Sequence, residues 1–305
     1  VNGGMWYQIK PEPDEDGHGV PWDEASRVKS QYHTVYALLG VAAATVANRP
    51  GAHELLETML QEQKDYWIDD YGLVWDQYDE AFTEPEPVHA LGTLIHTIEA
   101  YMAAAEATTE PEWLDRAEKM TAFAYKVASK NNWRIPEYYD EEWQPSLEAG
   151  KLCNDGRRYH EGYVTGHSMQ LARFTLQVRA GLRSMGWDVP DYLLEMGTEL
   201  FERARVDGWR RTGGAPGFST GVNDQGDPVP GEDEHQQWVV CEGVCAAVAV
   251  RRAMLDDGHR LDEVEHFEHC YRSFVDYIHD YLITQPGRWI RRLGPNNESV
   301  QPAKS

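Results

Sequence analysis

The chain has 305 residues, of which 41% are hydrophobic and 26 are glycine, an ordinary globular composition that excludes disordered and fibrous proteins. Lys and Arg total 28 against 51 Asp and Glu, so the formal net charge is -23. An acidic surface of this kind repels phosphate backbones and keeps a protein soluble at high salt. We therefore expect no nucleic-acid partner.

The sequence predicts neither a membrane span nor a signal peptide. Its longest nearly apolar run, residues 37–47, is too short to cross a bilayer, and no basic segment followed by an apolar stretch opens the chain. The four cysteines, Cys153, Cys241, Cys245 and Cys270, are too few and too scattered for a disulfide scaffold. Cys241 and Cys245 lie four apart in an apolar helical stretch, so we expect buried thiols in a reducing cytoplasm.

Hydrophobic periodicity predicts helices that come in four pairs. The expected pairs are 30–48 with 52–68, 90–107 with 111–130, 163–185 with 190–206, and 234–256 with 260–284. A short segment rich in aromatic residues and glycine follows each pair and is expected to form a β-hairpin or loop. These segments are 71–75, 133–135, 217–219 and 289–291.

A polar residue recurs near the start of the first helix of each pair. These residues are His33, His96, His167 and Gln237, spaced by about one helical hairpin plus its loop. The second helices are more highly charged, so the first helices are expected to form an inner ring and the second an outer ring. This pattern predicts an all-α fold, an α/α toroid. A lone histidine of this kind is usually a satisfied core imidazole, but three at one end of successive inner helices should converge on a common pocket.

The count of helix pairs also bears on domain organisation. A closed α/α barrel commonly has six pairs, whereas this sequence shows four. We therefore expect residues 1–305 to form a single barrel domain that is incomplete at both ends, with a helix pair or more before Val1 and at least one helix after Ser305.

Five short segments carry a resemblance to the N-acylglucosamine 2-epimerase superfamily. Residues 166–173 resemble its Gly-His-x-x-Glu-x-x-Arg helix start, 96–100 its Asn-Met-His-x-x-Glu-Ala helix, and 237–242 its His-Trp-x-x-x-Glu segment. Residues 133–143, with Trp133, Tyr139, Asp140 and Trp143, look like a loop of the D-mannose isomerase branch, and residues 31–34 resemble that branch's Tyr-Gly-His-Ala. Order and spacing hold over nearly the whole chain.

The resemblance implies a six-hairpin α/α barrel whose active site lies at the mouth formed by inner-helix ends and loops. Its members interconvert aldoses and ketoses or epimerise sugars at C2, with no metal or other cofactor. This chemistry needs a base to remove the proton α to the opened sugar's carbonyl and an acid to protonate the enediolate, and imidazole suits both tasks. By resemblance His167 is one of two catalytic histidines, and the other is expected beyond Ser305.

Three positions depart from the family pattern. Gln170 replaces the glutamate three residues after the catalytic histidine, which removes a charge that would orient His167 and raise its basicity. Gly92 replaces an asparagine and so deletes a sugar-hydroxyl contact, and Gln237 replaces a histidine. Together these changes point to an altered substrate or weakened catalysis.

Several candidate residues have a structural alternative. His96 and Glu99 fit sugar-hydroxyl binding and assistance of ring opening better than metal ligation. The group His266, His269 and Cys270 is better explained as a solvated helix face. Trp238, Trp133 and Tyr139 could stack on a sugar or fill the core.

Three charged candidates remain. Glu242 could hold a sugar or make a buried structural hydrogen bond. Arg134 and Glu137 could form a loop ion pair or bind hydroxyls. Arg173, one turn after Gln170, is expected in a structural salt bridge.

The leading hypothesis is a cofactor-free aldose–ketose isomerase acting on D-mannose or a close relative. His167 and Gln170 would form the catalytic group, with His33, His96, Glu99, Arg134, Trp238 and Glu242 around the monosaccharide. One rival is a sugar 2-epimerase using the same proton chemistry, and another is a glycosidase using Glu99 and Glu242 as its carboxylate pair. A third is a sugar-binding protein without catalysis. The oligomeric state stays open, and a homo-oligomer is compatible with the sequence.

Overall fold

The computed structural model describes residues 3–152, 159–209 and 215–300. The chain divides into two compact units, which are described separately. The first unit extends to Thr121 and includes the segment that begins at Glu137 and ends at Tyr159. The second comprises Ala122–Pro136 and the residues from His160 onward.

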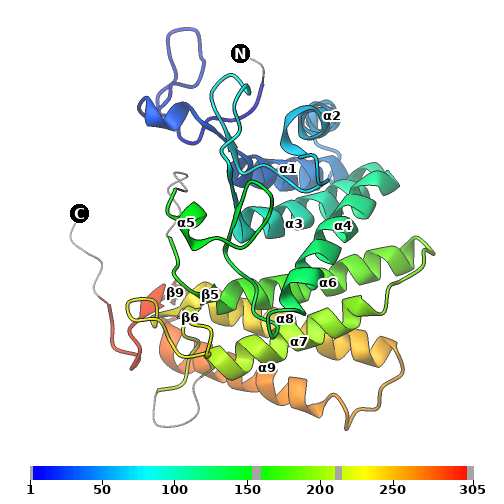
Figure 1. Ribbon diagram of the computed structural model, residues 1–305, viewed down its shortest axis with the longest axis vertical. Helices are drawn as coiled ribbons and strands as arrows, with labels where there is room; N and C mark the ends of the chain where they lie inside the picture. The colour runs from blue at the N-terminus through cyan, green and yellow to red at the C-terminus, as the bar shows by residue number, and fades with distance from the viewer. Residues whose placement is uncertain (1–2, 153–158, 210–214, 301–305) are drawn as a thin grey trace. The chain divides into compact units, whose positions relative to one another are not determined.

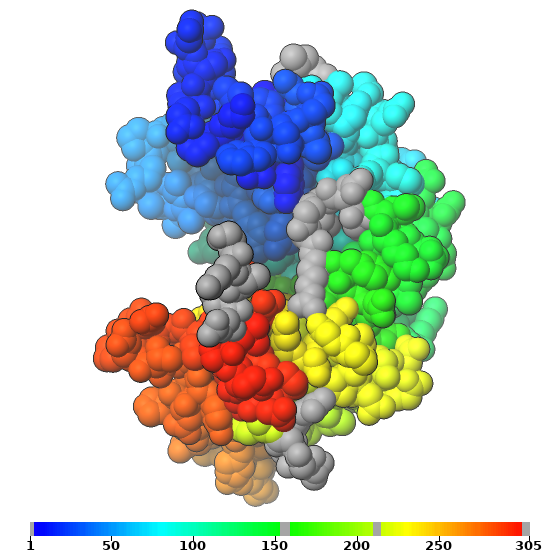
Figure 2. Space-filling model, turned by 90° about the vertical axis from the view of Figure 1, so that its left-hand side faces the viewer, coloured from blue at the N-terminus to red at the C-terminus, as the bar shows by residue number. Residues whose placement is uncertain are grey.

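The first unit begins with an N-terminal arm, the dark blue part of Figure 2. In it Trp6 pairs with Lys29 and Ile9 with Pro21. Its helices are η1 (Ala25–Arg27), α1 (Gln31–Val46), α2 (Ala52–Glu62), which continues as the π-helical turn η2 (Gln63–Trp67), α3 (Leu91–Thr108) and α5 (Leu147–Gly150) (Figure 1). The strands are β1 (Lys29–Ser30), β2 (Gln77–Tyr78), β3 (Val88–Ala90) and β4 (Tyr138–Asp140). Helix α4 (Pro111–Ala128) begins in this unit and ends in the second.

The second unit contains the helices α6 (Thr165–Ser184), α7 (Tyr192–Gly208), α8 (Gln237–Asp256) and α9 (Glu265–Tyr277), the last continuing as the π-helical turn η3 (Ile278–Leu282). Its strands are β5 (Tyr163–Val164), β6 (Gly221–Val222), β7 (His235–Gln236), β8 (Ile283–Gln285), β9 (Arg288–Trp289) and β10 (Arg292–Leu293). Within the described residues, every helix is too short or too polar to cross a bilayer.

The eight predicted helices are all present, with ends that differ from prediction by a few residues. The largest difference is at the start of α9, which begins at Glu265 and not at residue 260. At the starts of α6 and α8, residues expected to be helical lie in strands β5 and β7. Within each unit the first helices of successive pairs pack together, α1 on α3 and α6 on α8. The second helices pack on their own partners, α2 on α1, α7 on α6 and α9 on α8. The first helices thus pack on one another, and the second helices pack on the first helix of their own pair, as the predicted division into two sets of helices requires.

Of the four segments predicted to form a β-hairpin or loop, three have antiparallel pairs beside them: Ile68 with Val74, Trp209 with Phe218, and Ile283 with Trp289. The fourth, 133–135, is the loop alternative, a turn where Asn132 and Trp133 adopt positive φ values of 52° and 60°. A tight turn of this kind closes the end of α4 without strand pairing, since the Trp133 amide donates to the Ala128 carbonyl.

A second set of strand pairs, not predicted from the sequence, stands at the start of every first helix. These antiparallel pairs are β1 with β2, β3 with β4, β5 with β6, and β7 with β10. Beside each pair, the first backbone N–H of the helix donates to a carbonyl of the loop that precedes the partner strand. The four bonds run from Gln31 to Asp76 (2.9 Å), Leu91 to Glu137 (2.8 Å), Thr165 to Thr220 (3.0 Å) and Gln237 to Arg291 (2.9 Å).

Asp76 ties two of these helix starts together in the first unit. Its backbone carbonyl accepts from Gln31 at the start of α1, and its buried carboxylate accepts from the Ala90 amide (2.8 Å) and from the Thr93 hydroxyl. The carboxylate thus satisfies donors at the N-terminus of α3, where the helix dipole also favours negative charge.

We predict that Asp76→Ala lowers the free energy of unfolding by about 2–4 kcal/mol, because it leaves two buried donors at α3 without their charged acceptor. Chemical denaturation measures this change. Asp70→Ala removes the same charge from an exposed position and is the control. Equal stability of the two variants would contradict the role assigned to Asp76.

Candidate active site

The predicted site residues lie in two clusters, one in each unit. His33, His96 and Glu99 belong to the first unit. His167, Gln170, Trp238 and Glu242 lie together in the second, which also contains Arg134. Each cluster is built on the N-terminal turns of two first helices that pack side by side, α1 with α3 and α6 with α8.

His33 is the third residue of α1 and is held from several sides. Its Nδ1 lies 2.9 Å from the Ser30 hydroxyl. The rings of Tyr7 and Tyr32 meet the imidazole edge to face, with centroid distances of 4.9 and 5.6 Å. The N-terminal arm therefore contributes directly to the surroundings of His33, a contact that the sequence did not predict.

His96, on α3, is the centre of a hydrogen-bonded chain. Its Nδ1 lies 3.1 Å from Glu99 Oε2, and its Nε2 lies 2.8 Å from the hydroxyl oxygen of Tyr36 on α1. The side chain of His96 is only 8% exposed. Tyr32 and Tyr36, neither of them predicted as site residues, stand one turn apart on α1, and both rings contact His96. Their i, i+4 spacing beside His33 was the available sequence signal.

His167 is the third residue of α6 and packs against Trp238 of α8, with ring centroids 5.4 Å apart and planes inclined by 45°. The preceding residue has to be glycine, because a Cβ at Gly166 would lie 2.4 Å from the Trp238 ring. The Trp238 indole N–H donates to the Gln236 side chain (2.9 Å), which fixes the ring. The Gly-His pair thus brings imidazole and indole together.

Gln170, one turn after His167, bridges to α8. Its Nε2 lies 3.3 Å from Glu242 Oε1, and Arg173 makes a two-armed contact with the same carboxylate at 3.0 and 3.2 Å. The structural salt bridge expected of Arg173 is confirmed, and its partner is Glu242. Gln170 is only 6% exposed, and its Oε1 has no hydrogen-bond partner among the described residues. A buried acceptor of this kind can take a hydrogen bond from a ligand or a water molecule.

Arg134 is engaged by other protein groups. It donates two hydrogen bonds to Asp207, at 2.7 and 3.0 Å, and a third to the Asp224 carbonyl at 2.8 Å. Both side chains of the pair are at least nine-tenths buried. These contacts favour an ion pair for Arg134, but its partner is Asp207 and not the Glu137 expected from the sequence. They also make Arg134 a support for the 223–227 turn. Sugar binding by Arg134 stays a prediction.

The remaining candidates divide between core and surface. Tyr139 is fully buried and packs on Trp143, which favours the core role for Tyr139. Trp133 is half-buried and packs on Tyr125. His266 and His269 are exposed, as expected of a solvated face, whereas Cys270 is buried. Among the residues described, no group of three or more His, Cys, Asp and Glu is arranged to hold a metal ion.

The prediction of two buried thiols on α8 is wrong for one of them. Cys241 is half-buried, but Cys245 is exposed because it shares a solvent-facing side of α8 with Val248. Desolvation raises the pKa of both thiols, so neither is an activated nucleophile. Cys153 lies outside the described residues.

The common register proposed for the polar residues holds only in part. His33 and His167 are both the third residue of their helices. His96 is the sixth residue of α3, one turn deeper on the same face, and Gln237 is the first residue of α8. The position equivalent to His33 in α3 is Thr93, which binds Asp76.

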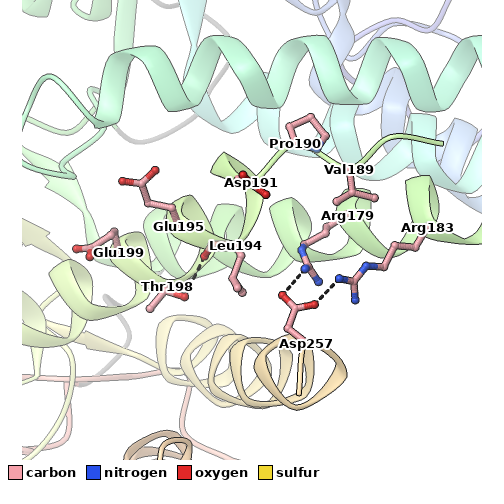
Figure 3. A pocket seen from close by; sticks show the side chains of 10 residues that line it. All are labelled: Arg179, Arg183, Val189, Pro190, Asp191, Leu194, Glu195, Thr198, Glu199 and Asp257. Carbon is pink, nitrogen blue, oxygen red and sulfur yellow. Dashed lines mark hydrogen bonds and ion pairs between the residues drawn. The ribbon is translucent and has the colours of Figure 1, made fainter. Parts of the chain in front are cut away.

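A cavity of about 600 Å³ lies at the opposite end of α6 (Figure 3). Arg179 and Arg183 face it and both pair with Asp257, while α7 contributes Leu194 and Glu195. Arg179 follows His167 by roughly 18 Å of helix at 1.5 Å per residue. The cavity is therefore separate from the histidine cluster.

Comparison with known proteins decides the family. The model of the N-acylglucosamine 2-epimerase family matches residues 11–305. The chain belongs to this family. It is 31% identical to a D-mannose isomerase of Thermobifida fusca over 93% of this chain and 68% of that protein, and 30% identical to one of Pseudomonas cannabina pv. alisalensis over 90% and 65%. The chain thus spans about two thirds of the length of these relatives.

Solved structures confirm the fold. A D-mannose isomerase crystal structure superposes with a TM-score of 0.79 at 21% identity, covering 95% of this chain and 72% of that one. The cellobiose 2-epimerase from Spirochaeta thermophila gives 0.76 at 16% identity, covering 99% and 69%. The predicted all-α fold of the α/α-barrel type is therefore confirmed.

Arg134→Lys separates the two roles considered for Arg134. A lysine cannot reproduce the two-armed contact with Asp207, so we predict that the free energy of unfolding falls by about 2–4 kcal/mol. The matched control is Arg272→Lys on the exposed face of α9. If Arg134→Lys weakens sugar binding while stability is unchanged, Arg134 contacts the sugar instead.

Proposed function

We propose that this protein interconverts an aldose and a ketose, with D-mannose and D-fructose as the type case, by histidine-mediated proton transfer. The observation that carries the proposal is His167 at the start of α6, packed against Trp238, in a chain of the N-acylglucosamine 2-epimerase family. An imidazole with an aromatic ring beside it suits a reaction that moves protons on a bound sugar.

The reaction starts from the open-chain sugar. A base removes the proton at C2, the electron pair of that C–H bond moves toward the carbonyl, and the oxygen is protonated to give the enediol. Return of a proton to C1, with loss of the C2 hydroxyl proton, gives the ketose. Imidazole, with an ordinary pKa near 6.5, can take and return protons near neutral pH. We assign the transfer at the sugar carbon to His167.

The other residues hold the substrate in this proposal. Trp238 provides an apolar face beside His167, and the unpartnered Oε1 of Gln170 accepts from a sugar hydroxyl. Glu242 fixes Gln170 and is itself fixed by Arg173. In the first unit, His33, His96 and Glu99 stay predicted sugar-hydroxyl contacts, and in the second unit Arg134 positions the 223–227 turn.

Epimerisation at C2 is the second candidate, supported by the fold likeness to cellobiose 2-epimerase. It shares the enediol but returns the proton to C2 on the opposite face. Hydrolysis by Glu99 and Glu242 is less well supported, because His96 and Arg173 already engage these carboxylates. A sugar-binding protein without catalysis is the remaining alternative.

We also propose a cytoplasmic location, because the few, scattered cysteines suit a reducing compartment. The oligomeric state stays open, and a homo-oligomer is compatible with the proposal.

His167→Asn tests the proposal in protein expressed from its complete reading frame. With D-mannose as substrate, we predict D-fructose formation by the wild type and a fall in kcat of about 10²- to 10⁴-fold in the variant. His269→Asn, on the exposed face of α9, is the control and should match the wild type. D-fructose formation unchanged by His167→Asn would contradict the assignment, and D-glucose as the product would establish the epimerase.

A further inference from the structure

A second cavity, of about 350 Å³, lies along the groove between α6 and α8. Its wall on α6 extends from Arg173 to Arg183, and its wall on α8 from Cys245 to Asp256. All of these residues belong to the second unit. The volume is within the range of about 300–1,000 Å³ that sites for small molecules occupy. We call it the α6–α8 cavity.

Arginine dominates the charged groups of the α6–α8 cavity. Among the described residues that line it are four arginines, Arg173, Arg179, Arg183 and Arg252, but a single carboxylate, that of Asp256. The chain as a whole has 51 Asp and Glu against 28 Lys and Arg. A cavity lined by positive charge attracts anions, even in a protein whose net charge is negative.

The three arginines on α6 each hold a carboxylate of the protein. Arg173 pairs with Glu242, and the two further arginines both reach Asp257, as Figure 3 shows. Arg252, on α8, has no ion-pair partner within the part of the chain that the structure describes. A guanidinium group is a planar fork of donors that matches a carboxylate. Arg252 is therefore the position of this cavity at which a ligand carboxylate fits.

Apolar side chains form much of the remaining wall. Leu176 on α6 is buried, whereas Val248 on α8 is 47% exposed although its side chain is aliphatic. Ala180, Ala249 and Ala253 add small side chains to the same wall. A ligand that covers Val248 removes apolar surface from water, which favours binding. The cavity thus combines an apolar wall with a cationic group.

The cavity of about 600 Å³ on the other side of α6 is less suited to an anion (Figure 3). It shares Arg179 and Arg183 with the α6–α8 cavity, but the segment at and within α7 contributes three further carboxylates, those of Asp191, Glu195 and Glu199. These groups would repel a ligand carboxylate. An anion is therefore expected between α6 and α8 and not between α6 and α7.

We propose that the α6–α8 cavity binds a small organic carboxylate. The ligand carboxylate pairs with Arg252, and the apolar body of the ligand lies against Val248 and Leu176. The arginines on α6 keep their own partners and add to the positive potential. The proposal concerns the second unit alone and requires no contact with the sugar.

Calorimetry with 2-naphthoate, on protein expressed from its complete reading frame, tests the charge of the ligand. We expect 2-naphthoate to bind, and its uncharged analogue 2-naphthamide to bind about threefold to tenfold more weakly. Arg252→Gln should weaken 2-naphthoate binding by a similar factor, the size expected for an exposed ion pair. Asp256→Asn removes a like charge and should strengthen binding by about twofold. Arg272→Gln, on the exposed face of α9, is the matched control and should bind as the wild type does.

Alkylation of cysteine tests the place of binding. Cys245 is exposed and lines the cavity, whereas Cys241, one turn earlier on α8, is half-buried and lies outside its wall. Saturating 2-naphthoate should slow the reaction of Cys245 with iodoacetamide, measured by mass spectrometry of the peptides. The rate at Cys241 should stay the same and is the internal reference.

The proposal is overturned by any one of three results. These are no binding of 2-naphthoate, equal Kd values for the wild type and Arg252→Gln, and an alkylation rate at Cys245 that 2-naphthoate leaves unchanged. None of these measurements depends on the conversion of D-mannose, so they leave the function proposed for His167 to its own test.

Discussion

The hydrogen bond at the start of each first helix is the constraint on which the rest of the structure depends. A helix leaves its first N–H groups without intrahelical partners, and a buried N–H without an acceptor is costly. In α1, α3, α6 and α8 the first N–H is satisfied by the loop next to a paired strand. Each pairing therefore fixes the residue at which the helix begins, and with it the direction of every side chain in the first turns.

The helix starts set the positions of the candidate residues. His33 and His167 occupy the third position of their helices, and His96 follows one turn deeper in α3. The first unit surrounds its imidazoles with tyrosines and a carboxylate. The second surrounds His167 with an indole and places an amide one turn away. In this account the sugar is held by hydroxyl contacts and the proton moves through His167.

The helices and their pairing could be predicted because periodicity and Pro or Gly boundaries are local signals. The partners of the functional groups could not, since they depend on contacts far along the chain. Arg134 is 73 residues from Asp207, and Tyr36 is 60 residues from His96. Strands of two or three residues leave no alternating pattern to detect. Cys245 is exposed because an apolar helix can turn one side to solvent, a property that composition alone does not reveal.

Proton transfer at the sugar carbon is the central claim, and solvent deuterium tests it most directly. Incubation with D-mannose in heavy water, followed by proton NMR, should show D-fructose with deuterium from solvent at C1. His167→Asn should slow both product formation and deuterium exchange by about 10²- to 10⁴-fold. Partial retention of the C2 hydrogen at C1 is compatible with one imidazole that carries the proton between the two carbons. D-fructose formation and deuterium incorporation at the wild-type rate in His167→Asn would contradict the account.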